Sequence, residues 1–302
     1  SIVNGVSRLE LKMDGPVENK RYGVNDYSLI FKDTNTLFVP GNGSLQAAVD
    51  SIKEDKAYMD KLANIAATFM TQFNDQHRAG AGIDKDKTSN LNFFGRNDKY
   101  YIWDKERQSL LAAKVTGTAS TTTGSPPVTT HTTTLSTTAG DTEELQGLEI
   151  IKAMKVSAEL VAQNGELKLA ARGFGDNSDA KNSYVQNLGY NNATIPPNLT
   201  GAGTVVHTTS DMNGTADGSN AVLLTNIFNM EQKDTGLTIY KSPTAGSPTE
   251  HRPTGTVSLN NYYNSVTSAL GIDSNAMDTK VKFQQDVMTQ IEAWRTSVSG
   301  VN

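Results

Sequence analysis

The clearest pattern in the chain is a helical repeat of apolar residues over positions 44–77. Apolar side chains recur every three or four residues, one turn is skipped at Asp55 and Lys56, and neither Gly nor Pro interrupts the segment. The repeating residues are Leu45, Val49, Ile52, Met59, Leu62, Ala66, Phe69 and Phe73. This spacing predicts one amphipathic helix, which would be roughly 50 Å long and would have Ser44 as its N-cap. A helix of that length is typical of a bundle or a rod.

A second set of helical repeats lies near the end of the sequence. Ser258 is expected to cap a helix that ends at Gly271, and a further helix is expected from about 274 to 299. The apolar stripe of this last helix is formed by Met277, Val281, Met288, Ile291 and Val298, with Gln284 and Arg295 between them. Because the stripes of the long helix and of the last helix are too wide to remain in water, we expect the two helices to pack together.

Alternating runs of apolar and polar residues predict strands outside the helices. Leu9, Leu11 and Met13 alternate with charged residues, which predicts a strand with one buried face. Further strands are expected over 27–31, 36–39, 100–103 and 110–115. The sequence therefore opens with a β-rich segment, and strands resume after the long helix.

The middle of the chain holds segments whose patterns are less regular. A surface loop is expected over 79–97. Strands are preferred to a helix over 148–161, where both patterns fit. Loops, with a short helical turn at 184–188, are expected over 173–218, because Asn, Gly, Asp, Thr and Ser dominate there. Apolar residues at helical spacing predict a helix over 220–230.

Residues 116–142 form a tract in which more than half of the side chains are Ser or Thr. Such a composition also suits a flexible stalk. Thr, however, favours strands because its branched Cβ fits a pleated sheet. We therefore expect exposed strands and loops in this tract rather than a stalk.

These patterns place helices in two distant parts of the chain and strands between them. The predicted fold class is α+β and multidomain, with a long-helix bundle built from sequence-distant segments and inserted β-rich domains. Residues 44–94 and 256–302 are expected to form a helical rod domain, and residues 1–43 a β-rich segment that packs on it. Residues 95–255 are expected to be one or two inserted β-rich domains with a core of their own, because their runs cannot extend the helical stripe.

Composition and charge exclude several classes of function. The 302 residues carry a net charge of −5, from 27 basic and 32 acidic side chains, so the chain has no basic footprint for nucleic acid. No apolar run approaches the ~20 residues that a membrane-spanning helix needs. Cysteine is absent, which excludes disulfides, zinc–cysteine sites and thiol nucleophiles.

The residue types that usually carry catalysis form no complete motif. None of the histidines lies in the H-E-x-x-H pattern of zinc proteases. Residues 84–88 begin like an EF-hand loop, but Ser89 and Gly95 replace the Gly and Glu that the loop requires. We therefore expect no enzyme, no cofactor and no metal site. His77 is expected to bond a free carbonyl near the end of the long helix.

Two stretches resemble the flagellar hook-associated protein 1 family. The first contains residues 43–49 (Gly-Ser-Leu-Gln-Ala-Ala-Val), residues 73–80 (Phe-Asn-Asp-Gln-His-Arg-Ala-Gly) and the aromatic pair Phe93 and Phe94. The second contains Tyr262, Tyr263, Val266, Leu270 and Gly271, followed by residues 295–302 (Arg-Thr-Ser-Val-Ser-Gly-Val-Asn). The two stretches cover about a third of the chain, in the order of the family, with a large middle between them that shows no family motif.

The resemblance implies a structural protein of the bacterial flagellum, without catalysis, that forms the junction between hook and filament. Its expected partners are further copies of itself in a ring, the hook protein, the filament-side hook-associated protein and an export chaperone. Its expected location is extracellular, on the flagellum, after export through the flagellar type III apparatus. In that family the terminal segments form coiled-coil regions, which are expected to lie outside the present sequence.

Candidate residues for helix packing or subunit contacts follow from the apolar stripes and from the resemblance. They are Leu62, Phe69, Phe73, Asn74, His77, Met288, Ile291, Trp294 and Val298. An alternative function stays open: an extracellular carbohydrate- or host-binding module carried by the β-rich middle. An assembly protein predicts rings or filaments, whereas a binding module predicts that this chain alone binds a ligand.

Overall fold

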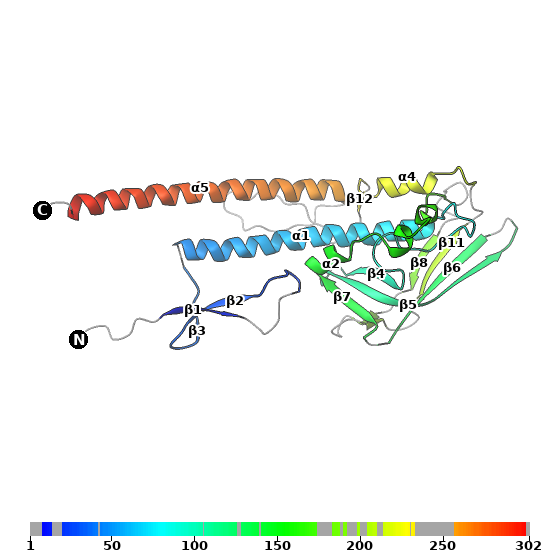
Figure 1. The fold of residues 1–302 in the computed structure, drawn as a ribbon, viewed down its shortest axis with the longest axis horizontal. Helices are drawn as coiled ribbons and strands as arrows, with labels where there is room; N and C mark the ends of the chain where they lie inside the picture. Colours follow the sequence, from blue (N-terminus) through cyan, green and yellow to red (C-terminus); the bar gives the residue numbers. More distant parts are fainter. Residues whose placement is uncertain are drawn as a thin grey trace.

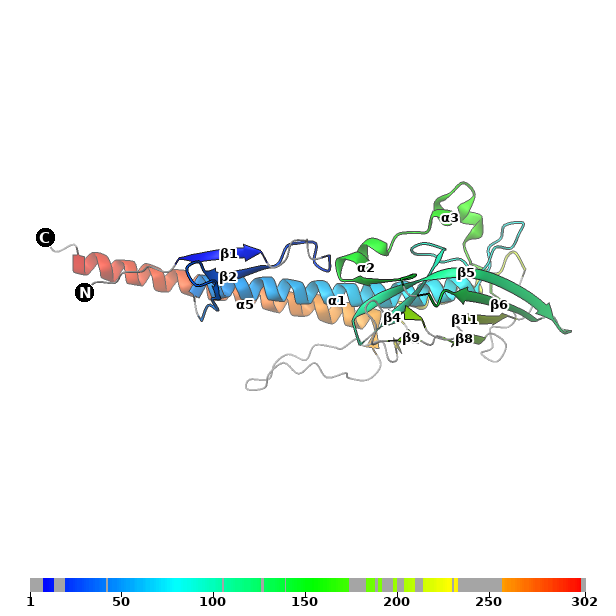
Figure 2. The same ribbon diagram turned by 90° about the horizontal axis from the view of Figure 1, so that it is seen from below.

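A computed structural model of the protein describes residues 8–13, 20–41, 43–104, 106–125, 128–138, 140–173, 183–187, 190–191, 198–199, 204–209, 214–229, 231–232 and 257–299. Two long helices lie side by side, and a large antiparallel sheet packs against one of them (Figures 1 and 2). The molecule is elongated along these helices (Figure 1). The α+β class predicted from the sequence is confirmed.

The two long helices are α1, Gly43–Ala79, and α5, Leu259–Ser299, which run antiparallel (Figure 1). The helix predicted over 44–77 is therefore confirmed. It begins at Gly43, one residue before the expected N-cap Ser44, whose side chain lies outside the described residues.

α5 is one helix where two were expected, which corrects the prediction from sequence. Gly271, the expected C-cap, lies inside the helix, and its backbone lacks the positive φ that such a cap needs. A glycine inside a helix costs only about 1 kcal/mol relative to alanine, which the remainder of so long a helix outweighs. The expected N-cap is confirmed, because the Asn261 N–H donates a hydrogen bond of 3.2 Å to Ser258 Oγ.

α1 and α5 pack together through one buried apolar cluster. The cluster contains Tyr58 and Ile65 of α1, Leu259, Tyr262 and Val266 of α5, and Leu224, Ile227 and Val257. Leu224 belongs to α4, Ser219–Asn226, which confirms the helix expected near 220. Val257 belongs to β13, Val257–Ser258, which pairs with β12, Glu231–Gln232.

The expected packing of the two long helices is observed, but at a different part of α5. The prediction placed the contact at residues 274–299, whereas the buried residues lie in the first third of the helix. Figures 1 and 2 show the reason: α5 runs past the start of α1. Most side chains of 274–298 are consequently exposed.

Six strands form the large sheet, in the order β4-β5-β6-β11-β8 with β7 paired to β5. They are β4 Lys99–Asp104, β5 Ser109–Thr123, β6 Val128–Leu135, β7 Thr142–Gln146, β8 Ser183–Asn187 and β11 Thr204–Thr209. The first part of β5 pairs with β4 and β7, and the part from Val115 onward pairs with β6. The strands expected in the Ser/Thr-rich tract are thus confirmed, and residues 116–125 are exposed.

The inner part of this sheet shares a core with α1. The shared cluster contains Ala63, Ala67 and Met70 of α1, Tyr101, Leu110 and Ala112 of the sheet, and Ile150 of α2. The small alanines leave room for the strands to approach the helix. The expectation that the middle has a core of its own is therefore corrected: its separate cluster, Tyr100, Ala113 and Leu135, is the smaller one.

Residues 148–161, which were expected as strands, form two short helices instead. These are α2, Leu148–Ala153, and α3, Ala158–Val161. A turn of 3-10 helix, η1, Gly165–Lys168, follows α3. Gly147 precedes α2 with φ of 49°, and Ile150 is the buried apolar residue of α2. α3 has no buried residue, so the two short helices together bury one side chain, which suits a segment that crosses the edge of the core rather than a strand within it.

The region 173–218, which was expected as loops, contains strands as well. Besides β8 and β11 it holds β9, Tyr190–Asn191, and β10, Asn198–Leu199, which pair with each other. The helical turn expected at 184–188 is a strand over its described part, and position 188 lies outside the described residues. Pairing of β8 with β11 overrides the local preference of this polar stretch.

The N-terminal segment forms a three-stranded antiparallel sheet of β1, Leu9–Met13, β2, Tyr27–Phe31, and β3, Thr36–Leu37. The sequence predicts these strands correctly, but the burial expected for one face of β1 is wrong. Leu9, Leu11 and Met13 are 44%, 66% and 44% exposed. The N-terminal sheet is held to α1 by residues between β1 and β2, and not by the apolar face of β1.

Those residues make three polar contacts with α1. Arg21 Nε donates to Asp60 Oδ1 at 2.8 Å, Tyr22 Oη donates to Asp60 Oδ2 at 3.1 Å, and Lys56 forms an ion pair with Asp26. The backbone carbonyl of Arg21 also accepts a hydrogen bond of 2.7 Å from the N–H at the start of α2. The N-terminal sheet is therefore anchored to both α1 and the inserted region.

Candidate functional site

Four of the nine candidate residues gather near the C-terminal end of α1. Phe69 and Phe73 lie one turn apart, with ring centroids 5.3 Å from each other. The rings of the loop residues Phe93 and Phe94 pack on Phe73 at 4.8 and 5.4 Å. The loop expected after the long helix is thus anchored by its aromatic pair, and these rings form a core contact.

Asn74 fixes the same loop by two reciprocal hydrogen bonds. Its Nδ2 donates to the Phe94 carbonyl at 3.0 Å, and the Phe94 N–H donates to its Oδ1 at 2.8 Å. Asn74 is buried away from water, and these two bonds give both the oxygen and the nitrogen of its side-chain amide a partner within the protein. Its role in this chain is to hold the loop on α1.

His77 joins three separate segments. Nδ1 lies 2.8 Å from the Leu91 carbonyl oxygen, and the Ala170 N–H donates to Nε2 at 3.1 Å. Since a carbonyl only accepts, Nδ1 carries the proton and Nε2 the lone pair. Burial lowers the pKa of His77 to about 4, so the ring is neutral at physiological pH. The expected bond to a carbonyl is present, and it goes to the loop rather than to the end of α1 itself.

The polar network beside His77 was not predicted from the sequence. Arg78 is buried, and it donates to Asn92 Oδ1 and to Asn90 Oδ1, each at 2.8 Å. Asn92 in turn donates to the Lys99 carbonyl at 2.8 Å. The available signal was the position of Arg78 directly after His77 within residues 73–80.

Gly80 closes this joint, because a side chain has no room there. A Cβ at this position would lie 2.1 Å from Asn220 Nδ2 and 2.8 Å from the Ala170 carbonyl oxygen. Asn220 Nδ2 occupies this space and donates a hydrogen bond of 2.5 Å to the same Ala170 carbonyl. The stretch 73–80 therefore encodes a joint between α1, the following loop and the start of α4.

The remaining five candidates lie elsewhere and are exposed. Leu62 is 41% exposed on α1. On α5, Met288, Ile291, Trp294 and Val298 are 56%, 49%, 69% and 81% exposed. These four occupy the same helical face as Tyr262 and Val266, which lie near the start of the helix and are buried against α1. The structure thus does not bring the α5 candidates together with the group around His77.

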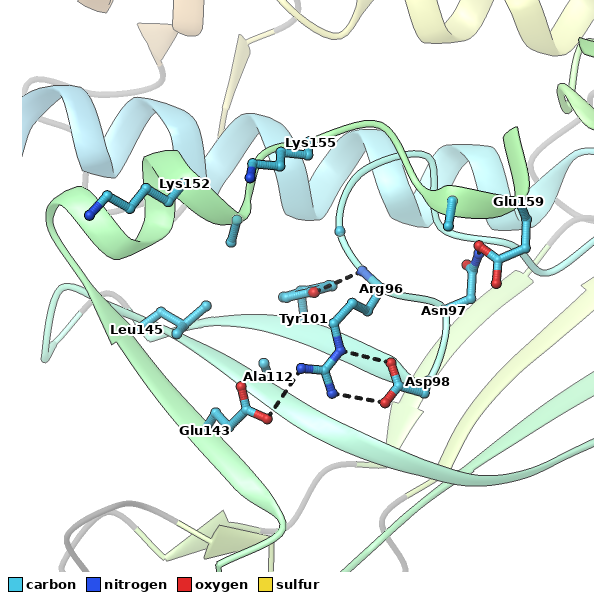
Figure 3. A pocket seen from close by; sticks show the side chains of 13 residues that line it. Arg96, Asn97, Asp98, Tyr101, Ala112, Glu143, Leu145, Lys152, Lys155 and Glu159 are labelled. Atoms are coloured by element: carbon cyan, nitrogen blue, oxygen red, sulfur yellow. Dashed lines mark hydrogen bonds and ion pairs between the residues drawn. The ribbon is translucent and has the colours of Figure 1, made fainter. Parts of the chain in front are cut away.

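A cleft of about 520 Å³ lies between the large sheet and the segment of α2 and α3 (Figure 3). Arg96 lies in it with two hydrogen bonds to Asp98, of 3.0 and 2.8 Å, and an ion pair of 3.7 Å with Glu143. The bond to Asp98 raises the pKa of Arg96, and the same bond lowers the pKa of Asp98. The phenol of Tyr101 accepts a hydrogen bond of 3.0 Å from the Arg96 N–H.

The charges in this cleft neutralise one another. Glu143 also forms an ion pair of 2.7 Å with Lys99, and Glu159 accepts a hydrogen bond of 2.5 Å from Asn97 Nδ2. Among the described lining residues, none is arranged as a nucleophile beside a base. The arrangement stabilises the junction of the sheet with α3.

Among the described helices, none combines the length and the hydrophobicity of a membrane-spanning segment. The described residues also contain no group of three or more His, Asp or Glu side chains that could hold a metal ion.

Comparison with known proteins gives a distant likeness to a solved structure. No family model matches the chain, and no curated protein matches it. Among solved structures, the chain is similar to the flagellar hook junction protein FlgK from Burkholderia pseudomallei, with a TM-score of 0.47 and 14% sequence identity. The match covers 97% of this chain and 70% of that chain.

Proposed function

We propose that the protein is a structural component of the bacterial flagellum at the junction of hook and filament, and that it acts by helix-mediated assembly without catalysis. One observation carries the proposal. The apolar face of α5 is covered by α1 in its first third, where Leu259, Tyr262 and Val266 are 0%, 3% and 2% exposed, and the same face is bare in its last third.

The bare face is costly for a protein that stays alone in water. Each aromatic side chain can bury about 150–250 Å² on contact, and burial stabilises by roughly 25 cal/mol per Å². Trp294, Ile291 and Val298 are spaced by three, four and seven residues, which is the spacing of a seam between helices. We infer that a helix of a neighbouring subunit covers this seam.

The family resemblance supports the same function from a different part of the chain. Its first motif, residues 73–80, supplies Asn74, His77, Arg78 and Gly80, and each of these has a defined role in the joint at the end of α1. The motif therefore specifies the joint that fixes the long helix to the inserted sheet. A junction protein needs such a joint to keep its axial helices in place while its outer part varies.

The domain organisation that accompanies this proposal is the one expected from the sequence. Residues 44–94 and 256–302 form the helical rod, residues 95–255 are inserted, and residues 1–43 pack on the rod. The partners we propose are further copies in a ring, the hook protein, the filament-side hook-associated protein and an export chaperone. The location we propose is extracellular, on the flagellum, after type III export.

Electron microscopy of isolated hooks tests the proposal. Gold-labelled protein is expected at the distal end of hooks from the same organism, and the double variant Ile291→Glu/Trp294→Glu is expected to lose that binding. The matched control is Thr289→Glu/Thr296→Glu, which adds the same charge to the opposite face of the same helix. Circular dichroism verifies that both variants keep their helices. Absence of the native protein from hook ends, together with binding of this chain to a glycan array, would favour the carbohydrate-binding alternative.

A further inference from the structure

The outer part of β5 is an edge strand of the large sheet. Residues 117–123 pair with β6 on one side, and among the described strands none pairs with them on the other side. The pairing of β5 with β4 and β7 is confined to residues 109–114. Figures 1 and 2 show the outer part of β5 projecting past the end of α1, at the rim of the sheet. Backbone N–H and C=O groups along this edge can therefore accept a further strand.

The side chains of this edge strand are open to solvent. Every residue of 116–125 is exposed, whereas His131 and Thr133 of the neighbouring strand β6 are buried. Exposure of consecutive residues means that both faces of this part of β5 are uncovered, because successive side chains of a strand point to opposite faces. A second strand can therefore approach the edge without displacing any other part of the chain.

The edge also lacks the charges that usually prevent strands from pairing with another chain. Three other edge strands, β1, β4 and β7, each carry two charged residues: Glu10 and Lys12, Lys99 and Asp104, and Glu143 and Glu144. Residues 115–140, in contrast, contain no Asp, Glu, Lys or Arg. Most of the side chains of 116–123 are Thr, which favours extended strands. The outer part of β5 is thus suited to pairing and is not protected against it.

This strand is complementary to itself. An antiparallel pair of two copies centred on Ser120 matches the whole free edge, with Ser120 facing Ser120 and Thr118 facing Thr122. Threonines at facing positions can form hydrogen bonds. The hairpin already contains such a pair, because Thr122 Oγ1 lies 2.9 Å from Thr129 Oγ1 of β6. The pairing has two-fold symmetry and uses the same edge of both copies, so it gives a closed dimer.

We propose that the outer edge of β5, residues 117–123, pairs with the same edge of a second copy of this chain, in an antiparallel register centred on Ser120. The strands β5, β6, β11 and β8 of each copy then form one continuous sheet across the dimer. Backbone hydrogen bonds make most of the contact, as in other cases of strand addition to an exposed edge. The contact lies far from the bare face of α5, and it does not depend on the flagellar function proposed above.

Sedimentation equilibrium tests the pairing. Ile291→Glu/Trp294→Glu serves as the background, because it removes association through α5, and its average mass should rise with concentration from one chain toward two. In this background, Thr118→Lys/Thr122→Lys should weaken dimerisation by about tenfold or more, because like charges face each other at two points of the pair. Thr118→Lys/Thr122→Glu is the matched variant. It places two charges at the same positions, but opposite charges face each other, so dimerisation should be restored.

Disulfide formation gives a second readout of the register. Facing Cα atoms of an antiparallel pair are about 4.5 or 5.5 Å apart, which is within the range of a disulfide. The chain has no cysteine, so Ser120→Cys introduces a single thiol at the centre of the pair, and oxidation should give a covalent dimer. Thr137→Cys, at an exposed position outside the strands, is the control and should stay monomeric.

Circular dichroism verifies that the variants keep their fold. The proposal is overturned if the background protein remains a monomer at every concentration up to its solubility limit. It is also overturned if the two double variants at positions 118 and 122 dimerise equally, or if the thiols at positions 120 and 137 form covalent dimers at the same rate.

Discussion

Tyr58 of α1 donates a hydrogen bond to Asp273 of α5, with 2.5 Å between Oη and Oδ2. The Tyr58 ring belongs to the buried cluster that joins the two helices, and Asp273 is only partly exposed. On the far side of Asp273, the apolar face of α5 is bare. The bond therefore marks the end of the buried contact between α1 and α5.

Removing this bond should weaken the pairing of the two helices. We expect Tyr58→Phe to lower the free energy of unfolding by about 1.5–3 kcal/mol, the typical contribution of a hydrogen bond to a charged group. Urea unfolding followed by circular dichroism measures the change. Tyr263→Phe is the control, because Tyr263 is exposed on α5 and should change stability by less than about 0.5 kcal/mol. Equal stability of the two variants would argue against a role for the bond.

The aromatic cluster at the end of α1 should be a larger source of stability. Phe69 packs against Phe73, Phe94 and Phe228, with centroid distances of 5.3, 5.7 and 5.8 Å. Phe69→Ala should therefore cost about 3 kcal/mol or more in unfolding free energy. Phe283→Ala removes the same group from a position that is 68% exposed, and its effect should be small. A small effect of both variants would show that the cluster does not contribute to the core.

The buried ring of His77 should make stability depend on pH. Its pKa is about 4 in the folded chain and about 6.5 when unfolded, so between these values the unfolded state binds the additional proton. Unfolding free energy should therefore fall as pH drops from 6.5 to 4, by roughly 3 kcal/mol for this group. In His77→Gln the fall should be smaller by that amount. Identical pH profiles of the two proteins would contradict the assignment of a neutral, buried ring.

The tip of the β5–β6 hairpin should be dispensable for the helices. Ser120 and His131 are register partners, so Asn-Gly in place of residues 121–130 can close the hairpin with a two-residue turn. The described side chains of 121–125 are exposed, and the core shared with α1 lies further along the sheet. We expect nearly unchanged helical signal at 222 nm and unchanged binding to hook ends. Loss of hook binding with the fold intact would instead make the tip a subunit contact.

The local elements of the fold could be predicted from the sequence, whereas features that depend on distant partners could not. The apolar repeat of α1 is local, and it indicated the helix and marked Phe69 as a candidate for helix packing or subunit contact. Gly271 is the residue type that commonly ends a helix, yet α5 continues through it. The strand β8 exists because β11 lies beside it, and the exposure of Leu11 depends on what covers the sheet.

The same distinction applies to the candidate site. Asn74 and His77 could be identified because they lie in a family-like stretch on a predicted helix. Their partners, Phe94, Leu91 and Ala170, come from a loop and a later segment, so only the fold assigns them. The buried pair of Arg78 and Asn92 was missed because a charged residue is expected at the surface unless its partners are known.

The most direct test of the account is the accessibility of α5 in assembled flagella. The chain has no cysteine, so Ile291→Cys and Thr289→Cys each introduce one thiol, on the apolar face and on the opposite face of the same helix. Maleimide should label both thiols quickly in the free protein. In flagella isolated from cells that express each variant, labelling of position 291 should fall at least tenfold relative to position 289. Equal labelling of the two positions in the assembled state would contradict the claim that the bare face of α5 is an assembly contact.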